Sequence, residues 1–205
     1  IVAACEKIIN GEFHNQFVVE IIQGGAGTST NMNANEVIAN VALEIIGKEK
    51  GDYDTISALD HVNMSQSIND TYPTALLVGF LKEYDPLLEA IKSLSDAFYA
   101  KGREFVDVIK MGRTQLQDAV PMTLGQEFCA FGDTLLLDID RLNEMSELFL
   151  EINLGATAIG TGVNSHPDYP KLAVEALAEL SGLPLVVDPH TIEATSDTSA
   201  FVSFS

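Results

Sequence analysis

The chain has 205 residues, of which 46% are hydrophobic and 20% charged, so it can bury a core and is not a disordered protein. Its 30 acidic and 11 basic residues give a formal net charge of −19, which argues against nucleic acid or anionic lipid as a partner. Two cysteines, no basic leader at the N-terminus and no apolar run of membrane-spanning length predict a cytoplasmic protein in a reducing compartment.

A Gly-rich loop at residues 24–27 leads directly into three hydroxyl residues at 28–30. Glycines let a backbone approach a ligand closely, because no Cβ atom stands in the way. Asn33 and Glu36 then predict the N-cap and capping partner of an amphipathic helix that ends at Gly47. A helix N-terminus beside hydroxyls can bind a carboxylate or phosphate without Arg or Lys, although a plain surface loop before a helix remains the alternative.

The polar segment 60–70, DHVNMSQSIND, precedes the next helical pattern. Such a density of Asn, Ser, Gln and Asp is typical of a loop, because these side chains bond local backbone groups. The pattern predicts a helix from Thr71 through Leu81 and a second helix that restarts at Asp85 and Pro86 and stops at Gly102. The last hydroxyl and amide of the polar segment should therefore lie at a helix N-terminus.

Residues 105–111 predict a short extended piece, and residues 112–121, GRTQLQDAVP, an irregular turn. The longest helix is expected from Thr123 to Ile152, where apolar residues hold a helical period for about thirty residues, or roughly 45 Å. Its apolar surface is wider than one stripe, which predicts burial on several faces in a helix bundle or a subunit interface. A Gly-rich turn at 154–164, a helix at about 168–181 and the start of another helix at 192–205 follow.

Four motifs follow one another along the chain. They are GGAGTSTNMNANE at 24–36, SQSIND at 65–70, GRTQLQDAVPMTLGQEF at 112–128 and NLGATAIGTGVN at 153–164. Together they resemble the aspartase and fumarase superfamily over nearly the whole chain. The GGAGTS loop, Gln115 after GRT, and the LGATA sequence are similar to the aspartase branch, whereas the fumarase branch typically carries a GSGT loop and a His after GRT.

The resemblance implies a mainly α protein with the central long-helix bundle of the aspartase/fumarase (L-aspartase-like) fold, here incomplete. It implies a homotetramer in which each active site is shared between subunits. The reaction that it implies is reversible anti-elimination of ammonia from L-aspartate to give fumarate through an aci-carboxylate intermediate. Donors aimed at the β-carboxylate would stabilise the charge that develops there. No cofactor is expected to be required.

The resemblance also implies a substrate site of six positions. They are Thr28 and Ser67 for the β-carboxylate, Ile68 next to them, Asn69 facing the amino group, and Thr114 with Gln115 lining the α-carboxylate or leaving-group side. Without the resemblance, capping of a turn would be the better interpretation of the last pair.

Two departures from the family pattern matter. Ile68 stands where the family usually has Ser or Thr, which removes a hydroxyl expected to contact the substrate; loss of such a donor can cost on the order of a hundredfold in rate. The family loop GSSxMPxKxN, which carries the base Ser and a substrate-binding Lys, is absent from the sequence. The chain is therefore expected to be a fragment of the family fold, with the catalytic base outside it.

In terms of that fold, residues 1–69 are predicted to be the C-terminal part of an N-terminal helical domain and residues 70–205 the N-terminal part of the central bundle. The four His residues show no metal-site spacing and are expected to be surface or locally bonded groups. The acidic residues could bind a divalent cation such as Mg²⁺ as an activator, although a solvated surface is the simpler interpretation. A fumarase, or a non-catalytic helical assembly module, remains an alternative to the aspartase function.

Overall fold

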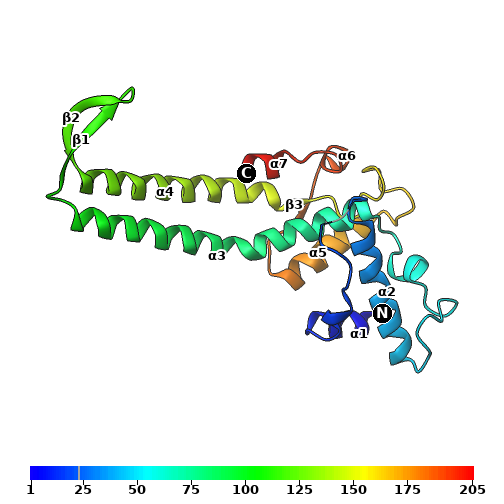
Figure 1. The fold of residues 1–205 in the computed structure, drawn as a ribbon. Coiled ribbons are helices and arrows are strands. Elements are labelled where there is room, and N and C mark those ends of the chain that lie inside the picture. Colours follow the sequence, from blue (N-terminus) through cyan, green and yellow to red (C-terminus); the bar gives the residue numbers. More distant parts are fainter. Residues whose placement is uncertain (23) are drawn as a thin grey trace. The chain divides into compact units, whose positions relative to one another are not determined.

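The computed structural model describes residues 1–22 and 24–205, which are mainly helical, as predicted (Figure 1). The helices are α1 (Val2–Ile9), α2 (Thr28–Ile45), α3 (Ile68–Glu104), α4 (Leu124–Ser146), α5 (Tyr169–Ser181), α6 (Thr191–Ala194) and α7 (Ser199–Phe204), with short turns of helix η1 (His14–Gln16), η2 (Ala58–Val62) and η3 (Glu147–Phe149). The strands are β1 (Ile109–Thr114), β2 (Gln117–Thr123), β3 (Glu151–Ile152) and β4 (Val186–Val187). Within these described residues, no helix combines the length and the apolar character that crossing a membrane requires.

The chain divides into two compact units. Unit 1 comprises residues 1–78 and 150–198, and unit 2 comprises residues 79–149 and 199–205. Helix α3 contributes its first part to unit 1 and the remainder to unit 2. The predicted boundary after residue 69 concerns the domains of the complete family fold and stays a prediction.

In unit 1 a small core forms where α1 packs against α2. Its buried members are Ala4, Val37, Val41 and Ala42, and partly buried side chains such as Ile8 and Phe13 surround them. Helix α2 ends before Gly47, as predicted, and this glycine has a φ of +76°. The short parallel pair of β3 and β4 joins the segment after residue 150 to the segment after α5.

The predicted start of α2 at Asn33 is wrong, because the helix begins five residues earlier, at Thr28, after a left-handed Gly27. Asn33 instead lies inside the helix. Its side chain accepts a hydrogen bond from Val18 N at 3.0 Å and donates one to the Gln16 carbonyl at 3.1 Å. The Asn side chain therefore ties down the preceding loop, which the local capping pattern could not reveal.

The expectation of two helices separated at Pro86 is also wrong. Helix α3 runs without interruption for 37 residues, and it is the longest helix, whereas α4 has 23 residues and gives way to the short turn η3. A proline removes one backbone hydrogen bond from a helix. Buried residues lie on both sides of the proline, Tyr84 at 6% and Ser95 at 0% exposure, so both parts of the helix are packed against the rest of unit 2. The predicted helix at 192–205 is likewise two short helices, α6 and α7.

In unit 2 the C-terminal part of α3 runs alongside α4 (Figure 1). The buried Ser95 hydroxyl donates to the Gly132 carbonyl at 3.0 Å, and Gly102 and Gly125 allow the two backbones to approach closely. Phe98, on α3, and Phe128 and Phe131, on α4, stack edge to face or tilted beside this contact. Small residues thus set the spacing of the two helices, and aromatic rings fill the space beside them.

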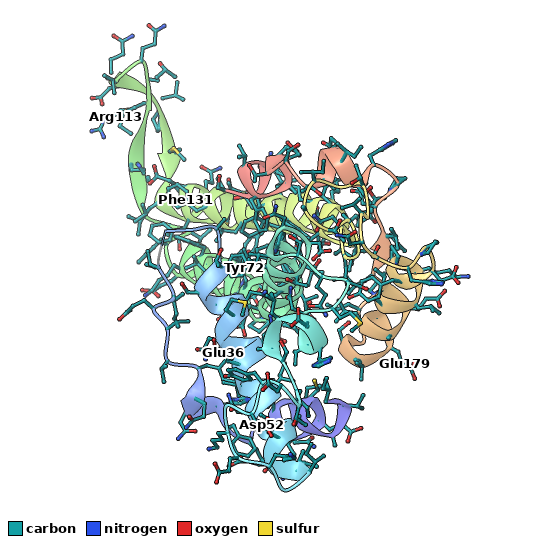
Figure 2. All side chains as sticks on the ribbon, turned by 90° about the vertical axis from the view of Figure 1, so that its right-hand side faces the viewer. Glu36, Asp52, Tyr72, Arg113, Phe131 and Glu179 are labelled. Atoms are coloured by element: carbon teal, nitrogen blue, oxygen red, sulfur yellow. The ribbon has the colours of Figure 1, made fainter. Side chains whose placement is uncertain are left out.

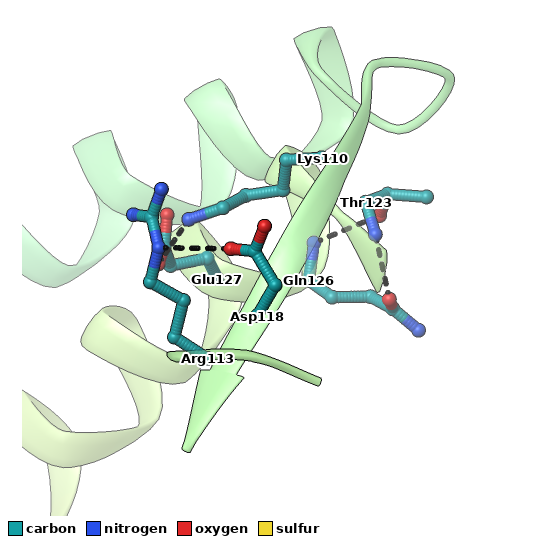
Figure 3. Close-up of polar contacts among 6 residues, drawn as sticks. All are labelled: Lys110, Arg113, Asp118, Thr123, Gln126 and Glu127. Carbon is teal, nitrogen blue, oxygen red and sulfur yellow. Dashed lines mark hydrogen bonds and ion pairs between the residues drawn. The ribbon is translucent and has the colours of Figure 1, made fainter. Parts of the chain in front are cut away.

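Residues 105–111 were predicted as an extended piece and residues 112–121 as an irregular turn, whereas residues 109–123 form an antiparallel hairpin of β1 and β2. An ion pair of 2.6 Å between Lys110 and Glu127 joins the hairpin to the start of α4 (Figure 3). That helix begins with a capping box, in which Gln126 N donates to Thr123 Oγ1 at 3.1 Å and Thr123 N donates to Gln126 Oε1 at 2.9 Å. The alternating apolar and polar residues were too few to reveal these strands.

The close approach of the helix backbones at Gly125 generates a prediction. A Cβ atom on Gly125 would overlap backbone atoms of Gly102 and Val106. We expect Gly125→Ala to lower the free energy of unfolding by about 1 to 3 kcal/mol, because the two helices must separate. Gly79→Ala is the matched control: it lies in α3 with nothing within 4 Å of the added Cβ, and it should raise stability by about 0.5 to 1 kcal/mol. Urea unfolding followed by circular dichroism measures both, and equal effects would contradict the prediction.

Candidate functional site

The SQSIND motif forms the N-terminal turn of α3, which begins at Ile68, three residues before the predicted start at Thr71. Ser67 Oγ accepts a hydrogen bond from Asn69 N at 3.2 Å, and the Asp70 carboxylate accepts one from Ser67 N at 2.9 Å. These two bonds form a reciprocal cap, which satisfies backbone N–H groups that a helix start would otherwise leave without partners. The Ser67 hydroxyl is therefore held at the positive end of the α3 dipole.

Asp70 connects this turn to a distant loop. Its side chain is completely buried, at 0% exposure, and its Oδ2 atom accepts hydrogen bonds from Gly155 N at 3.2 Å and Thr157 N at 2.9 Å. Burial raises the pKa of the Asp70 carboxyl, while backbone N–H groups, including those of Ser67 and Thr157, oppose the rise. Because all of these partners are donors, the ionised carboxylate is the form that fits the site.

Asn69 and Asn153 make a second connection between the same segments. Asn69 Nδ2 donates to the Ala158 carbonyl at 2.6 Å, and Asn153 Nδ2 donates to the Asn69 carbonyl at 3.0 Å. Asn153, only 3% exposed, also donates to Thr195 Oγ1 at 3.1 Å. The bond to Ala158 orients the Asn69 amide, so that Oδ1 is the atom that could accept a hydrogen bond from an amino group.

The N-terminus of α2 lies against the same part of α3. Gly27 packs so closely on the ring of Tyr72, labelled in Figure 2, that a Cβ atom would overlap it. Thr71 Oγ1 donates to Asn31 Oδ1 at 3.1 Å, which links the first turns of the two helices. Thr28 is exposed, and its hydroxyl donates to the Gly25 carbonyl at 2.7 Å. The structure thus brings Thr28 and Ser67 to adjoining helix N-termini, although the Thr28 proton is bonded within its own loop.

A pocket of about 220 Å³ lies between the SQSIND turn and the Gly-rich loop of residues 154–164. Its lining residues are Ser65, Gln66, Ser67, Thr157, Ala158, Val163 and Asn164. Three of these lining residues have positive φ values, which are unusual for residues other than glycine: Ser65 at 63°, Thr157 at 59° and Asn164 at 65°. Backbone strain of this kind persists only where surrounding contacts hold it, and it is concentrated at functional sites.

Tyr169, the first residue of α5, interacts with Asp70 and Gln66 of the segment that precedes and begins α3. Burial raises the pKa of Tyr169, the negative charge of Asp70 raises it further, and a hydrogen bond with the Gln66 side chain opposes both. A phenol with a raised pKa stays protonated at neutral pH.

The remaining predicted site residues occupy two different places. Ile68 is the first residue of α3, beside Ser67, and is partly buried. Thr114 and Gln115 belong to unit 2, at the tip of the β1–β2 hairpin that also carries Arg113 in Figure 2. Gln115 and Leu116 form a two-residue turn with φ values of 49° and 65°. Four of the six predicted positions are thus gathered in unit 1.

Three residues of this site were not predicted: Asp70, Asn153 and Thr157. The spacing of Ser67 and Asp70 is that of a capping pair, a signal that was available in the sequence. The contacts of Asn153 and Thr157 span more than eighty residues and have no local signal. Among the residues that the structure describes, no three His, Cys, Asp or Glu side chains are grouped to hold a metal ion, and Cys5 and Cys129 are free thiols.

Comparison with known proteins shows relatives along the whole chain. A family model described as lyase matches residues 1–205. An aspartate ammonia-lyase from Pseudomonas aeruginosa is 62% identical over 203 residues, which are 98% of this chain and 43% of that protein. A fumarate lyase:delta crystallin from Brucella melitensis, whose crystal structure is bound to cobalt, has a sequence 56% identical to this chain. Its structure matches with a TM-score of 0.91 over 99% of this chain and 44% of that one. A class II fumarase from Schistosoma mansoni is 31% identical, with a TM-score of 0.85 over 99% of this chain and 46% of that one. The chain spans less than half the length of each of these proteins.

The contact between Gly27 and Tyr72 can be tested by adding one methyl group. Gly27 has a φ of +85°, and a Cβ atom there would overlap the tyrosine ring, so Gly27→Ala should lower the free energy of unfolding by about 2 kcal/mol or more. Gly24→Ala is the control, because nothing lies within 4 Å of its added Cβ, and its effect should stay within about 0.5 kcal/mol. Thermal unfolding of the two variants measures the difference, and a harmless Gly27→Ala would show that the loop does not pack on α3.

Proposed function

The chain belongs to the lyase family whose model matches residues 1–205, and from this membership we propose that it is part of an aspartate ammonia-lyase. The observation that carries the proposal is the SQSIND turn, which holds the Ser67 hydroxyl and the Asn69 amide at the start of α3, in a chain 62% identical to a protein of that name. The proposed reaction is reversible elimination of ammonia from L-aspartate to give fumarate.

The chemistry requires donors that stabilise a doubly charged carboxylate. Removal of the proton next to the β-carboxylate converts that group into an aci-carboxylate dianion, so the strongest interactions should form in the transition state. Ser67 and Thr28, at adjoining helix N-termini, are proposed to donate to this group, Thr28 after its hydroxyl turns away from the Gly25 carbonyl. In a chain with a net charge of −19, neutral hydroxyls and helix dipoles supply donors where cationic side chains are scarce.

The other end of the substrate is assigned to different residues. Asn69 Oδ1 is proposed to accept from the substrate amino group, in the orientation that its bond to the Ala158 carbonyl fixes. Thr114 and Gln115, at the hairpin tip of unit 2, are proposed to line the α-carboxylate or leaving-group side. We assign them to a site shared between subunits of a homotetramer.

No base is assigned within this chain. The sequence contains no GSSxMPxKxN loop, which carries the proton-abstracting Ser in the superfamily that it resembles. We propose that another segment supplies this Ser and a substrate-binding Lys. We further propose that the reaction requires no cofactor and that a divalent cation such as Mg²⁺ acts at most as an activator. The protein is proposed to be cytoplasmic.

The assignment of substrate rests on the difference between two comparisons. Identity to the aspartate ammonia-lyase is 62%, against 31% to the class II fumarase. A complete lyase that contains this chain should therefore convert aspartate in preference to malate, which parallel assays of the two substrates test. Preference for malate would support a fumarase, and absence of both activities would support the non-catalytic assembly module.

The 205-residue chain alone should release no measurable ammonia from aspartate, because no residue in it is assigned as the base. Fumarate formation, followed by the ultraviolet absorbance of the conjugated dicarboxylate, measures this. The complete lyase, at the same molar concentration, is the control. Robust turnover by the chain alone would show that the base lies within it.

The chain should also self-associate in solution. Phe131, Leu137 and Leu148 on and after α4 are each 46% to 54% exposed, which leaves an apolar surface for partner helices. Light scattering of the purified chain tests this, and a well-behaved monomer would contradict it.

Restoring a hydroxyl beside Ser67 gives a further prediction. In the complete lyase, Ile68→Thr should raise kcat/KM for aspartate by about tenfold or more, because a new donor can reach the developing charge. Ile68→Val is the matched control, since it has the same branched shape without the hydroxyl and should leave kcat/KM nearly unchanged. Equal rates for the two variants would remove position 68 from the substrate site.

A further inference from the structure

We infer that Asp70 is a positioning residue, which holds the Ser67 and Asn69 side chains in the geometry that substrate binding needs; this inference rests on the proposed function. Asp70 is fully buried, so it cannot itself contact a substrate that enters from solvent. Its effect passes through the groups that its carboxylate binds, on two segments more than eighty residues apart.

The first of these segments is the turn before α3. Oδ1 of Asp70 accepts from Ser67 N at 2.9 Å, which fixes the backbone of the residue whose hydroxyl is assigned to the β-carboxylate. In the same turn, Asn69 N donates a hydrogen bond to Ser67 Oγ at 3.2 Å. Rotation of the Ser67 backbone would therefore displace the hydroxyl and break the cap at once.

The second segment is the Gly-rich loop. Oδ2 of Asp70 accepts from Gly155 N and Thr157 N, and this holds Thr157 at a φ of 59°, in the left-handed region that a β-branched residue disfavours. The neighbouring Ala158 carbonyl accepts from the Asn69 amide at 2.6 Å. Asp70 thus fixes the position of the Ala158 carbonyl, which orients the Asn69 amide, and it also fixes the Ser67 backbone, which orients the Ser67 hydroxyl.

Charge makes this role specific to a carboxylate. A buried carboxylate that accepts several backbone N–H bonds is stabilised by each of them, and one oxygen can bind two donors. In Asp70→Asn, the side chain keeps its volume, but one of its two oxygens is replaced by an NH2 group that cannot accept. Whichever segment this group faces, donors meet donors, so the shared side chain must shift and its bonds to both segments weaken.

The test is a double-mutant cycle in a complete lyase that contains this chain. Asp70→Asn should lower kcat by about tenfold with a smaller change in KM, and Ser67→Ala should lower it by about a hundredfold, because both disturb a donor to the transition state. Because Asp70 positions Ser67 as well as Asn69, its loss should cost less when the Ser67 hydroxyl is already gone, so the double variant should be less than about a thousandfold slower than the wild type. Multiplicative losses would overturn the inference.

The assays are run at a temperature where circular dichroism shows every variant folded, so that a loss of stability alone leaves kcat unchanged. Asp52→Asn is the matched control: this carboxylate accepts a hydrogen bond from Thr55 Oγ1 at 3.0 Å in a surface turn of the same unit, and its removal should leave kcat and KM unchanged. A loss of kcat in Asp52→Asn equal to that in Asp70→Asn would overturn the inference.

Amide hydrogen exchange keeps the inference separate from the proposed function. In Asp70→Asn, the N–H groups of Ser67, Gly155 and Thr157 should exchange at least about tenfold faster than in the wild type, while the amides of α2 keep their rates. If the wild-type lyase converts neither aspartate nor malate, the proposed function fails, and exchange alone then decides whether Asp70 positions the turn. Unchanged exchange at the three amides would overturn the inference, whatever the activity.

Discussion

One buried carboxylate holds together the parts of unit 1 from which a site can be built. Asp70 caps its own helix through Ser67 and accepts hydrogen bonds from Gly155 N and Thr157 N, so its removal from water is partly compensated by charge-assisted hydrogen bonds, although burial still raises the pKa of the carboxyl. Leaving a charge buried without such partners is costly. Two segments that lie far apart in the sequence are therefore bound to one another through a single side chain.

The Asn69 and Asn153 amides work in the same way, with neutral groups instead of a charge. Each donates to a carbonyl across the same two segments, and Asn153 adds a third element, the end of α6, through Thr195. Within the part of the chain that the structure describes, Thr157 Oγ1 is buried without a hydrogen-bond partner, so the backbone bonds to Asp70 and not the Thr157 hydroxyl hold this residue in the network.

The sequence was sufficient for what depends on local spacing. It predicted the mainly helical fold, the end of α2 at Gly47, the helix at 169–181, and hydroxyl and amide groups at the start of α3. It could not predict what depends on distant contacts: Asn33 binds a preceding loop instead of capping a helix, α3 continues through Pro86, and residues 109–123 pair as strands.

In the candidate site, too, the residues with a local sequence signal were predicted and those that depend on distant contacts were not. Ser67 and Asn69 were predicted from a motif, whereas the partners that orient them, on the loop of residues 153–158, became visible only in three dimensions. The same is true of the strained backbone at Ser65, Thr157 and Asn164, since positive φ values at residues other than glycine arise from tertiary contacts.

The turn between β1 and β2 has a thermodynamic consequence. Two-residue hairpin turns with both φ values positive favour Asn and Gly, yet here they are Gln115 and Leu116, and the Leu116 side chain is 100% exposed. A surface that covered this leucine would gain about 1.5 to 3 kcal/mol from its burial. Because the two residues share one turn, that gain would also bias the conformation of Gln115. If Gln115 lines the substrate site as proposed, covering Leu116 and binding substrate are linked equilibria, and each changes the affinity of the other by the same factor.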